Sequence, residues 1–117
     1  MVVEKDNDVL AVEKTGLYEG RYHVLGATLD PLGSPDTVRE RINALSARLS
    51  TKDLERPREV ILALSPSKAG EFTSEYIQKI ISPLKIKVTR LGRGLATGTE
   101  LEYADEYTIR QAFDNRK

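Results

Sequence analysis

Apolar positions follow two different periods along the chain, and the alternation of these periods predicts an α/β fold. Residues 59–64 form a continuous apolar run between proline-containing turns, the pattern of a central strand buried on both faces of a parallel sheet. Before it, Ser34 and Pro35 offer the cap and the first residue of a helix. Apolar residues then recur at spacings of four, three and four on one helical face, at Val38, Ile42, Leu45 and Leu49.

Similar patterns predict further elements on either side. Residues 6–8 offer capping side chains to a short helix that Gly16 ends, and residues 21–25 alternate as a strand does. A helix that Pro83 ends is predicted from the helical spacing of Phe72, Tyr76, Ile77, Ile80 and Ile81. A β-branched strand follows at residues 86–91. The last predicted elements are a short strand at Leu101 and Tyr103 and a helix containing Tyr107, Ile109, Ala112 and Phe113.

Strands that alternate with helices through short connections predict a doubly wound, mostly parallel sheet with right-handed crossovers and helices on both faces. Ligands and partners of such sheets bind beyond the carboxyl ends of the strands. We therefore look for function in four loops, at residues 4–8, 26–30, 65–71 and 92–98.

Composition narrows the possible functions. The 117 residues suit one domain, and 18 basic residues balance 18 acidic ones, so no overall positive field attracts a polyanion. The absence of cysteine excludes disulfides, a thiolate nucleophile and a cysteine-ligated zinc site. No apolar run approaches the roughly 20 residues that cross a bilayer, and no secretory leader is visible, so we expect a soluble, cytoplasmic protein. The abrupt apolar start at residues 1–3 is interpreted as the start of a piece cut from a longer chain.

Acidic residues in these loops offer two alternatives. Glu4 follows the apolar run at residues 1–3, the first predicted strand, and Asp8 lies one helical turn further. Glu71 ends the loop after the central, third strand, so the three carboxylates can form a partner-binding cluster. Alternatively, Asp8 and Glu71 only stabilise helix N-termini through the dipole. A magnesium site needs carboxylates from more than one strand end, whereas the central strand ends in two serines and Lys68. We therefore predict no metal and no cofactor.

Basic residues gather between residues 79 and 93, and an acidic stretch follows at residues 100–106. Lys68, Arg90 and Arg93 are our candidates for contacts with nucleic-acid phosphates, weak because the domain is neutral; the alternative is a solvated surface of mutually paired charges. The lone His23 has no partner at a catalytic spacing, so we interpret it as structural rather than as a general base.

Ordered motifs cover nearly the whole chain. The longer ones are Val-Val-Glu at residues 2–4, Asp-Val-Leu-Ala-Val-Glu-Lys-Thr-Gly at 8–16, Tyr-His-Val-Leu-Gly at 22–26, Ile-Lys-Val-Thr-Arg-Leu at 86–91 and Leu-Glu-Tyr-Ala-Asp-Glu at 101–106. Shorter matches lie at Leu29 and at residues 31–32, 70–71 and 93–95. Together they resemble the RecR family of bacterial recombination mediators, over its Toprim domain and C-terminal segment.

The resemblance implies a Toprim-type α/β fold at residues 1–99 and a C-terminal segment at residues 100–117 that takes part in self-association. It implies a DNA repair and recombination module that works with RecO and RecF to load recombinase onto single-stranded gaps, as a homo-oligomer that binds rather than catalyses. It also implies that acids of this domain contact RecO, and that DNA is bound weakly or only within the full assembly.

One departure from the family pattern bears on catalysis. After the third strand the family usually has Thr-Asn-Pro-Thr-Val-Glu-Gly-Glu, whereas residues 64–71 read Leu-Ser-Pro-Ser-Lys-Ala-Gly-Glu, with Ala69 in place of the first acid. Catalytic Toprim proteins carry Asp-x-Asp where this chain has Ser65 and Ser67. This favours a protein that is not an enzyme. The alternatives are a metal-dependent Toprim nuclease or primase fragment and an oligomerising scaffold without a ligand.

Overall fold

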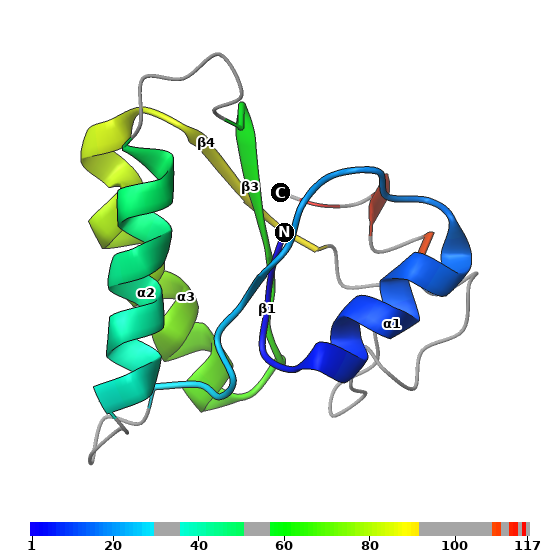
Figure 1. Ribbon diagram of the computed structural model, residues 1–117, viewed down its shortest axis with the longest axis horizontal. Helices are drawn as coiled ribbons and strands as arrows, with labels where there is room; N and C mark the ends of the chain where they lie inside the picture. Colours follow the sequence, from blue (N-terminus) through cyan, green and yellow to red (C-terminus); the bar gives the residue numbers. More distant parts are fainter. Residues whose placement is uncertain (30–35, 51–56, 92–108, 111–112, 115, 117) are drawn as a thin grey trace.

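The chain forms a parallel sheet between two layers of helices in a computed structural model, which describes residues 1–29, 36–50, 57–91, 109–110, 113–114 and 116 (Figure 1). The sheet has four strands in the order β2-β1-β3-β4, all paired in parallel, so the predicted architecture is confirmed. The elements are β1 Val2–Val3, α1 Asp6–Thr15, β2 His23–Val24, α2 Asp36–Leu49, β3 Glu59–Ala63, α3 Lys68–Ile81, the 3₁₀ turn η1 Ser82–Leu84 and β4 Lys87–Arg90.

Strands β1 and β3 occupy the centre of the sheet. Val2 pairs with His23 on one side and with Leu62 on the other, so β1 is bonded along both edges. β3 is bonded in turn to β4, with Glu59 opposite Lys87. Four of the five residues of β3 are buried, because a central parallel strand is covered on both faces. The apolar run at residues 59–64 therefore predicted the central strand correctly.

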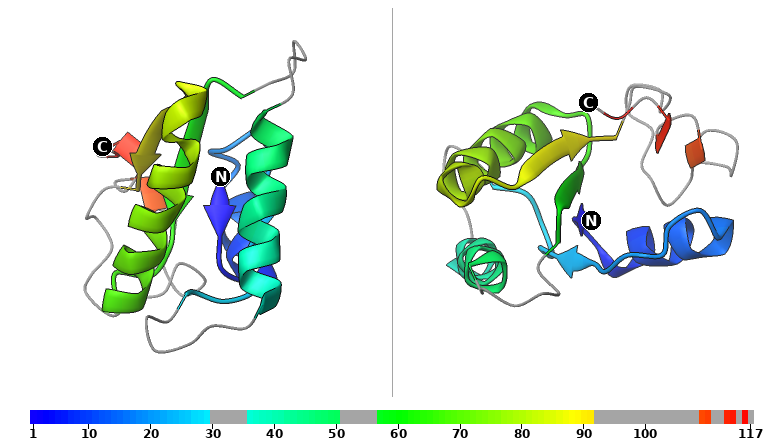
Figure 2. Two further views of the ribbon diagram at one scale, coloured as in Figure 1. Left: turned by 90° about the vertical axis from the view of Figure 1, so that its left-hand side faces the viewer. Right: turned by 90° about the horizontal axis from the view of Figure 1, so that it is seen from above.

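Helices α2 and α3 cover one face of the sheet (Figures 1 and 2). The four apolar residues predicted to share one face of α2 are all buried there, against Ile77 and Ile81 of α3 and against Val2 and Leu62 of the sheet. One residue of the predicted apolar stripe on α3 departs from it, since Phe72 is 39% exposed. Helical spacing groups this residue with Tyr76 but does not say how far the stripe extends over the neighbouring elements.

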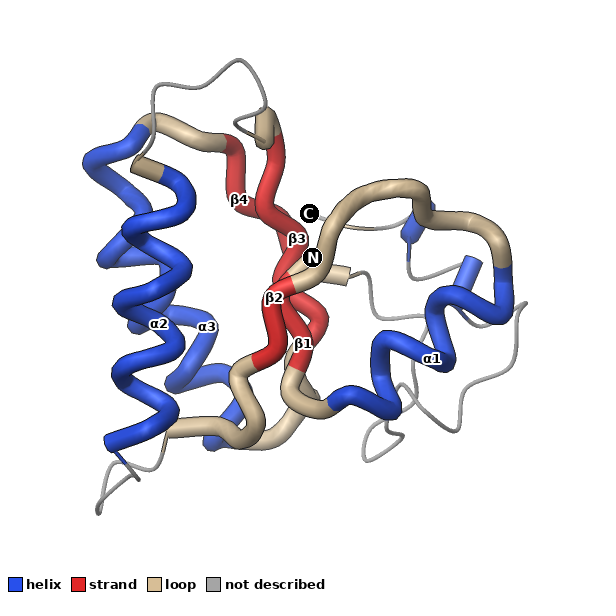
Figure 3. The backbone as a smooth tube through the Cα atoms, viewed as in Figure 1, coloured by secondary structure: helices blue, strands red, loops and turns tan. Residues whose placement is uncertain are grey.

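Helix α1 and the C-terminal turns cover the opposite face, as Figure 3 shows. Val3 and Ile61 point to this side and pack in one cluster with Val12 of α1 and with Ile109 and Phe113. The two C-terminal residues lie in helical turns, in agreement with the predicted terminal helix. Val3 of β1 and Phe113 lie in the same cluster, so the two ends of the chain share one core.

Both ends of α1 can be explained from single residues. The helix begins before the predicted capping residues 6–8 end, because Lys5 is the N-cap and Asp6 is already helical. Asp8 lies at the third helical position and its carboxylate accepts a hydrogen bond from the Lys5 N–H, at 3.1 Å. At the other end, Gly16 adopts a φ of 66°, a left-handed conformation that glycine reaches without steric cost.

Several predicted features lie outside the described residues: Ser34 and Pro35, the loop at 92–98, and the strand at Leu101 and Tyr103. Tyr107 and Ala112 lie outside them as well. Across the part of the chain that the structure describes, no helix combines the length and the apolar character needed to span a membrane.

The two helical layers give a direct test of which positions hold the core. Ile77 is fully buried, whereas Leu10 on α1 is 58% exposed. Ile77→Ala should therefore lower the free energy of unfolding by about 2–5 kcal/mol, because the deletion leaves a cavity. Leu10→Ala is the control and should change it by less than about 0.5 kcal/mol. Chemical denaturation of both variants measures this, and equal losses would contradict the assigned core.

Candidate functional site

Glu4 joins three loops at the carboxyl ends of the strands. Its side-chain Oε1 accepts a hydrogen bond from the Ser65 N–H after β3, at 2.7 Å. Its backbone carbonyl accepts a hydrogen bond from the Gly26 N–H after β2, at 2.6 Å. The sequence predicted that these loops meet, because parallel strands end at the same edge of a sheet, and the structure confirms the meeting for the first three strands.

The turn that leads from β3 into α3 is closely packed. The Ser67 hydroxyl accepts a hydrogen bond from the Gly70 N–H and so caps α3, while the Ser65 and Ser67 hydroxyls lie 2.9 Å apart. A Cβ at Gly70 would lie 1.9 Å from the Ser65 carbonyl oxygen, so no larger residue fits without moving the backbone. The serines at the end of β3 therefore shape this turn.

Thr73 is a residue of this region that sequence reasoning missed. It is fully buried, its hydroxyl accepts a hydrogen bond from the Leu29 N–H at 2.8 Å, and it donates to the Ala69 carbonyl at 2.7 Å. It therefore ties the loop after β2 to α3. The available signal was a threonine four residues before Ile77 of the predicted apolar stripe, where a buried hydroxyl needs a partner.

Each of the three predicted partner-binding acids has a contact of its own. Glu4 bonds to the Ser65 N–H, and Asp8 is only 6% exposed while it accepts from the Lys5 N–H. The Glu71 carboxylate forms an ion pair with Arg90 at the end of β4 and is the most accessible of the three. The structure thus gives Glu4 and Asp8 structural contacts, and their role in partner binding stays a prediction.

The residues predicted to bind nucleic acid differ in their contacts within the chain. Lys68 is exposed at the first residue of α3. Arg90 donates to Glu71 and, at 3.2 Å, to the Gln78 side chain, so its guanidinium is already engaged. Arg93 lies outside the described residues. Contact of these residues with phosphates stays a prediction.

The residues at the strand ends do not fit the divalent metal of catalytic Toprim proteins. The Glu4 carboxylate accepts a peptide N–H, and the position that should supply further carboxylates holds Ser65 and Ser67. Among the described residues, no group of three histidine, aspartate or glutamate side chains could hold a metal ion. We therefore derive no chemical step through a metal here.

Both ring nitrogens of His23 are engaged with α2, at the Arg41 carbonyl and the Arg48 guanidinium. His23 also lies on the face of the sheet opposite to Tyr22 and Val24, as strand alternation predicted. These contacts agree with the interpretation of His23 as a structural residue.

A second carboxylate anchors the C-terminal turns. Glu59 at the start of β3 accepts hydrogen bonds from the Thr89 hydroxyl at 2.5 Å and from Arg116 at 3.0 Å. The Thr89 hydrogen bond holds the pKa of Glu59 below its usual value, and Arg116 lowers it further, against the opposing effect of burial. Sequence reasoning did not find this contact, because nothing in the sequence relates residues 57 positions apart.

Comparison with known proteins matches each of the two parts of the chain to a protein family model. The family model of the Toprim domain matches residues 1–92, and the model described as RecR, C-terminal, matches residues 94–117. Proteins named Recombination protein RecR are 47% identical in Dehalococcoides mccartyi over 99% of this chain and 55% of the relative, and 49% identical in Chlorobaculum parvum over 98% and 56%. The relative in Thermobifida fusca is 45% identical over 99% and 57%. The chain thus spans little more than half the length of these relatives.

The Glu4 contact should contribute to stability. Glu4→Ala removes the acceptor of the Ser65 N–H and should lower the free energy of unfolding by about 1–2 kcal/mol. Glu4→Gln is the matched control, because its amide oxygen can still accept this hydrogen bond, and it should lose less. Denaturation gives the free energies, and amide hydrogen exchange at Ser65 reports the contact itself. Two variants as stable and as protected as the parent would contradict a structural role of Glu4.

Proposed function

The chain belongs to the RecR family of recombination proteins, and on this premise we propose that it is the Toprim and C-terminal part of a DNA repair and recombination mediator. In this role it works with RecO and RecF to load recombinase onto single-stranded DNA gaps in the bacterial cytoplasm. The observation that carries the proposal is the agreement between two family models that together cover nearly the whole chain and relatives that are 45–49% identical over almost all of it.

We propose that the module acts by binding and not by catalysis. The turn after β3 supports this, since Ser65 and Ser67 close onto α3 where a catalytic Toprim protein needs carboxylates. The Glu4 carboxylate, which a metal would require, accepts a hydrogen bond from the Ser65 N–H. Self-association through residues 100–117 is part of the proposal.

The surface at the ends of β3 and β4 is the proposed meeting point of protein partner and DNA. Glu71 is exposed and acidic, as a contact to a basic partner requires, and Arg90 and Lys68 beside it can contact phosphates. In the free chain, the acidic Glu71 and the basic Arg90 neutralise each other in an ion pair. A partner that binds Glu71 would therefore release Arg90, and DNA that binds Arg90 would release Glu71.

The proposal of binding without catalysis has a direct test. With Mg²⁺ or Mn²⁺, the chain should neither cut nor join nor prime DNA, because the described residues offer no group of three acidic or histidine side chains that could hold a metal. A catalytic Toprim protein assayed in parallel shows that the conditions support turnover. Metal-dependent turnover that is lost in Glu4→Gln would instead favour a nuclease or primase.

The ion pair provides a test of both binding roles. Glu71→Gln should weaken RecO binding, mainly by slowing association, because an exposed charge steers encounter. The same change frees Arg90, so binding to single-stranded DNA should strengthen, and the plot of log affinity against log salt should steepen by about 0.7 for one added phosphate contact. Biosensor kinetics and a salt titration measure the two effects.

Glu75→Gln is the matched control, because Glu75 is exposed on the same helix and its loss changes net charge equally. If both variants bind RecO and DNA alike, the effect is one of total charge and the roles of Glu71 and Arg90 are wrong. A thermal melt of each variant separates binding from folding, since an exposed ion pair contributes at most about 1 kcal/mol.

A further inference from the structure

His23 connects β2, the outermost of the described strands on this side of the sheet, to helix α2 through both nitrogens of its ring. Nε2 lies 2.6 Å from the Arg41 carbonyl oxygen, and Nδ1 lies 2.8 Å from Nη1 of Arg48. A carbonyl can only accept and a guanidinium can only donate, so the ring carries its proton on Nε2 and offers a lone pair on Nδ1. The contacts therefore require the neutral imidazole in one tautomer.

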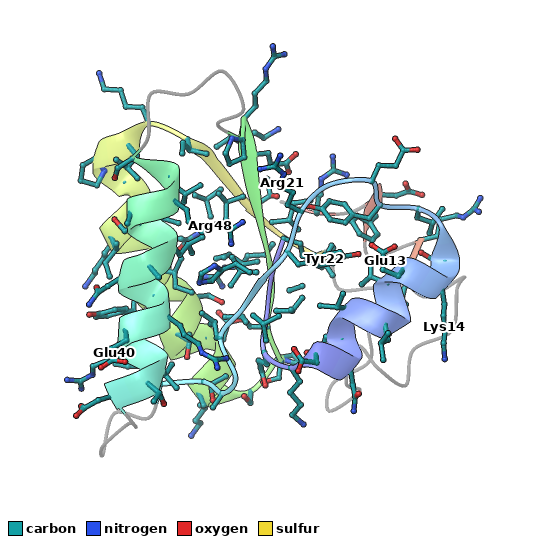
Figure 4. The ribbon with its side chains drawn as sticks, viewed as in Figure 1. Glu13, Lys14, Arg21, Tyr22, Glu40 and Arg48 are labelled. Carbon is teal, nitrogen blue, oxygen red and sulfur yellow. The ribbon has the colours of Figure 1, made fainter. Side chains whose placement is uncertain are left out.

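The same two arginines cover the outer edge of β2. The N–H groups of His23 and Leu25 donate to β1, each at 2.9 Å, so the carbonyls of Tyr22 and Val24 point away from the sheet. Arg48 donates to the Tyr22 carbonyl at 3.3 Å, and Arg41 reaches the Val24 carbonyl at 3.5 Å. Figure 4 shows Arg48 extending from α2 toward the strands. The guanidiniums thus occupy acceptors that another strand would otherwise use.

We propose that His23 is a proton-sensitive clasp that holds α2 against the β2 edge of the sheet when its ring is neutral and releases Arg48 when the ring is protonated. A proton on Nδ1 converts the acceptor into a donor, so the Arg48 contact is lost. Release of Arg48 also removes the donor that covers the Tyr22 carbonyl. The Tyr22 carbonyl then has no donor from α2, while Arg41 still reaches the Val24 carbonyl.

The charges around the ring favour the neutral form. The charged groups that act on it are the guanidinium cations of Arg48 and Arg41 on α2 and the amino group of Met1, which precedes β1. Burial lowers the pKa of that amino group to about 6, so it is charged mainly in acid. Burial is the largest cause that lowers the pKa of His23 below its ordinary 6.5, and these cations add to it, while the bond to the Arg41 carbonyl works in the opposite direction. The clasp is therefore closed at neutral pH and opens in acid.

The sign of the stability change follows from this direction. The unfolded chain takes up its proton near pH 6.5, while the folded chain resists it. The contribution of the neutral ring is complete above that pH and falls as the pH drops toward the lower pKa of the folded state. His23→Gln, which has no such titration, should lack this part of the pH dependence.

The experiment uses the fact that the chain contains one histidine, so a long-range ¹H–¹⁵N spectrum shows a single ring. We expect the Nε2–H tautomer, a titration midpoint below 6.5, and faster amide exchange at His23 and Leu25 below that midpoint after correction for intrinsic rates. Arg48→Gln should raise the midpoint, because it removes a facing cation. Arg39→Gln, at an exposed position of the same helix, is the control and should leave it unchanged.

One further measurement completes the test. The difference in free energy of unfolding between the parent and His23→Gln should change with pH only below 6.5. The Nδ1–H tautomer, a midpoint at or above 6.5, or a midpoint that is the same in Arg48→Gln would overturn the proposal.

Discussion

The burial of strand β1 on both faces and along both edges is the constraint on which the rest of the structure depends. Val2 is 1% exposed and faces α2 and α3, while Val3 is fully buried and faces α1 and the C-terminal turns. Two residues make few ladder hydrogen bonds, so side-chain burial in two separate cores must hold this strand in register. Because Glu4 follows directly, the same burial delivers its carboxylate to the loop after β3 and determines where the strand-end loops meet.

Glu4 acts as a structural acceptor at the strand ends. Its carboxylate accepts a peptide N–H beside the turn in which Ser67 caps α3, and these contacts hold the loops together. Accessible charge lies beside them in the Glu71–Arg90 pair, at the start of α3 and the end of β4. Such a pair suits recognition of a charged partner, in line with the proposed function.

Contacts of three arginines hold together elements that are distant in sequence. Arg90 pairs with Glu71, Arg116 pairs with Glu59, and Arg48 contacts the ring of His23. Each of these contacts joins elements that are distant in sequence: α3 to β4, the C-terminal turns to β3, and α2 to the edge of the sheet. Arg90 is therefore engaged with Glu71 in the free chain, and its contact with nucleic acid stays a prediction.

The sequence by itself determined the identity and order of the main elements. Burial of one face of α2 leaves apolar residues at helical spacing, and burial of β3 on both faces leaves a continuous apolar run, so both elements can be read locally. It also predicted that the loops after the strands meet, since parallel strands share one end. Only the tertiary structure decided that Phe72 is exposed, that Thr73 anchors the loop at Leu29, and which arginine meets which carboxylate. These outcomes depend on distances between side chains far apart in sequence, and periodicity carries no information about such distances.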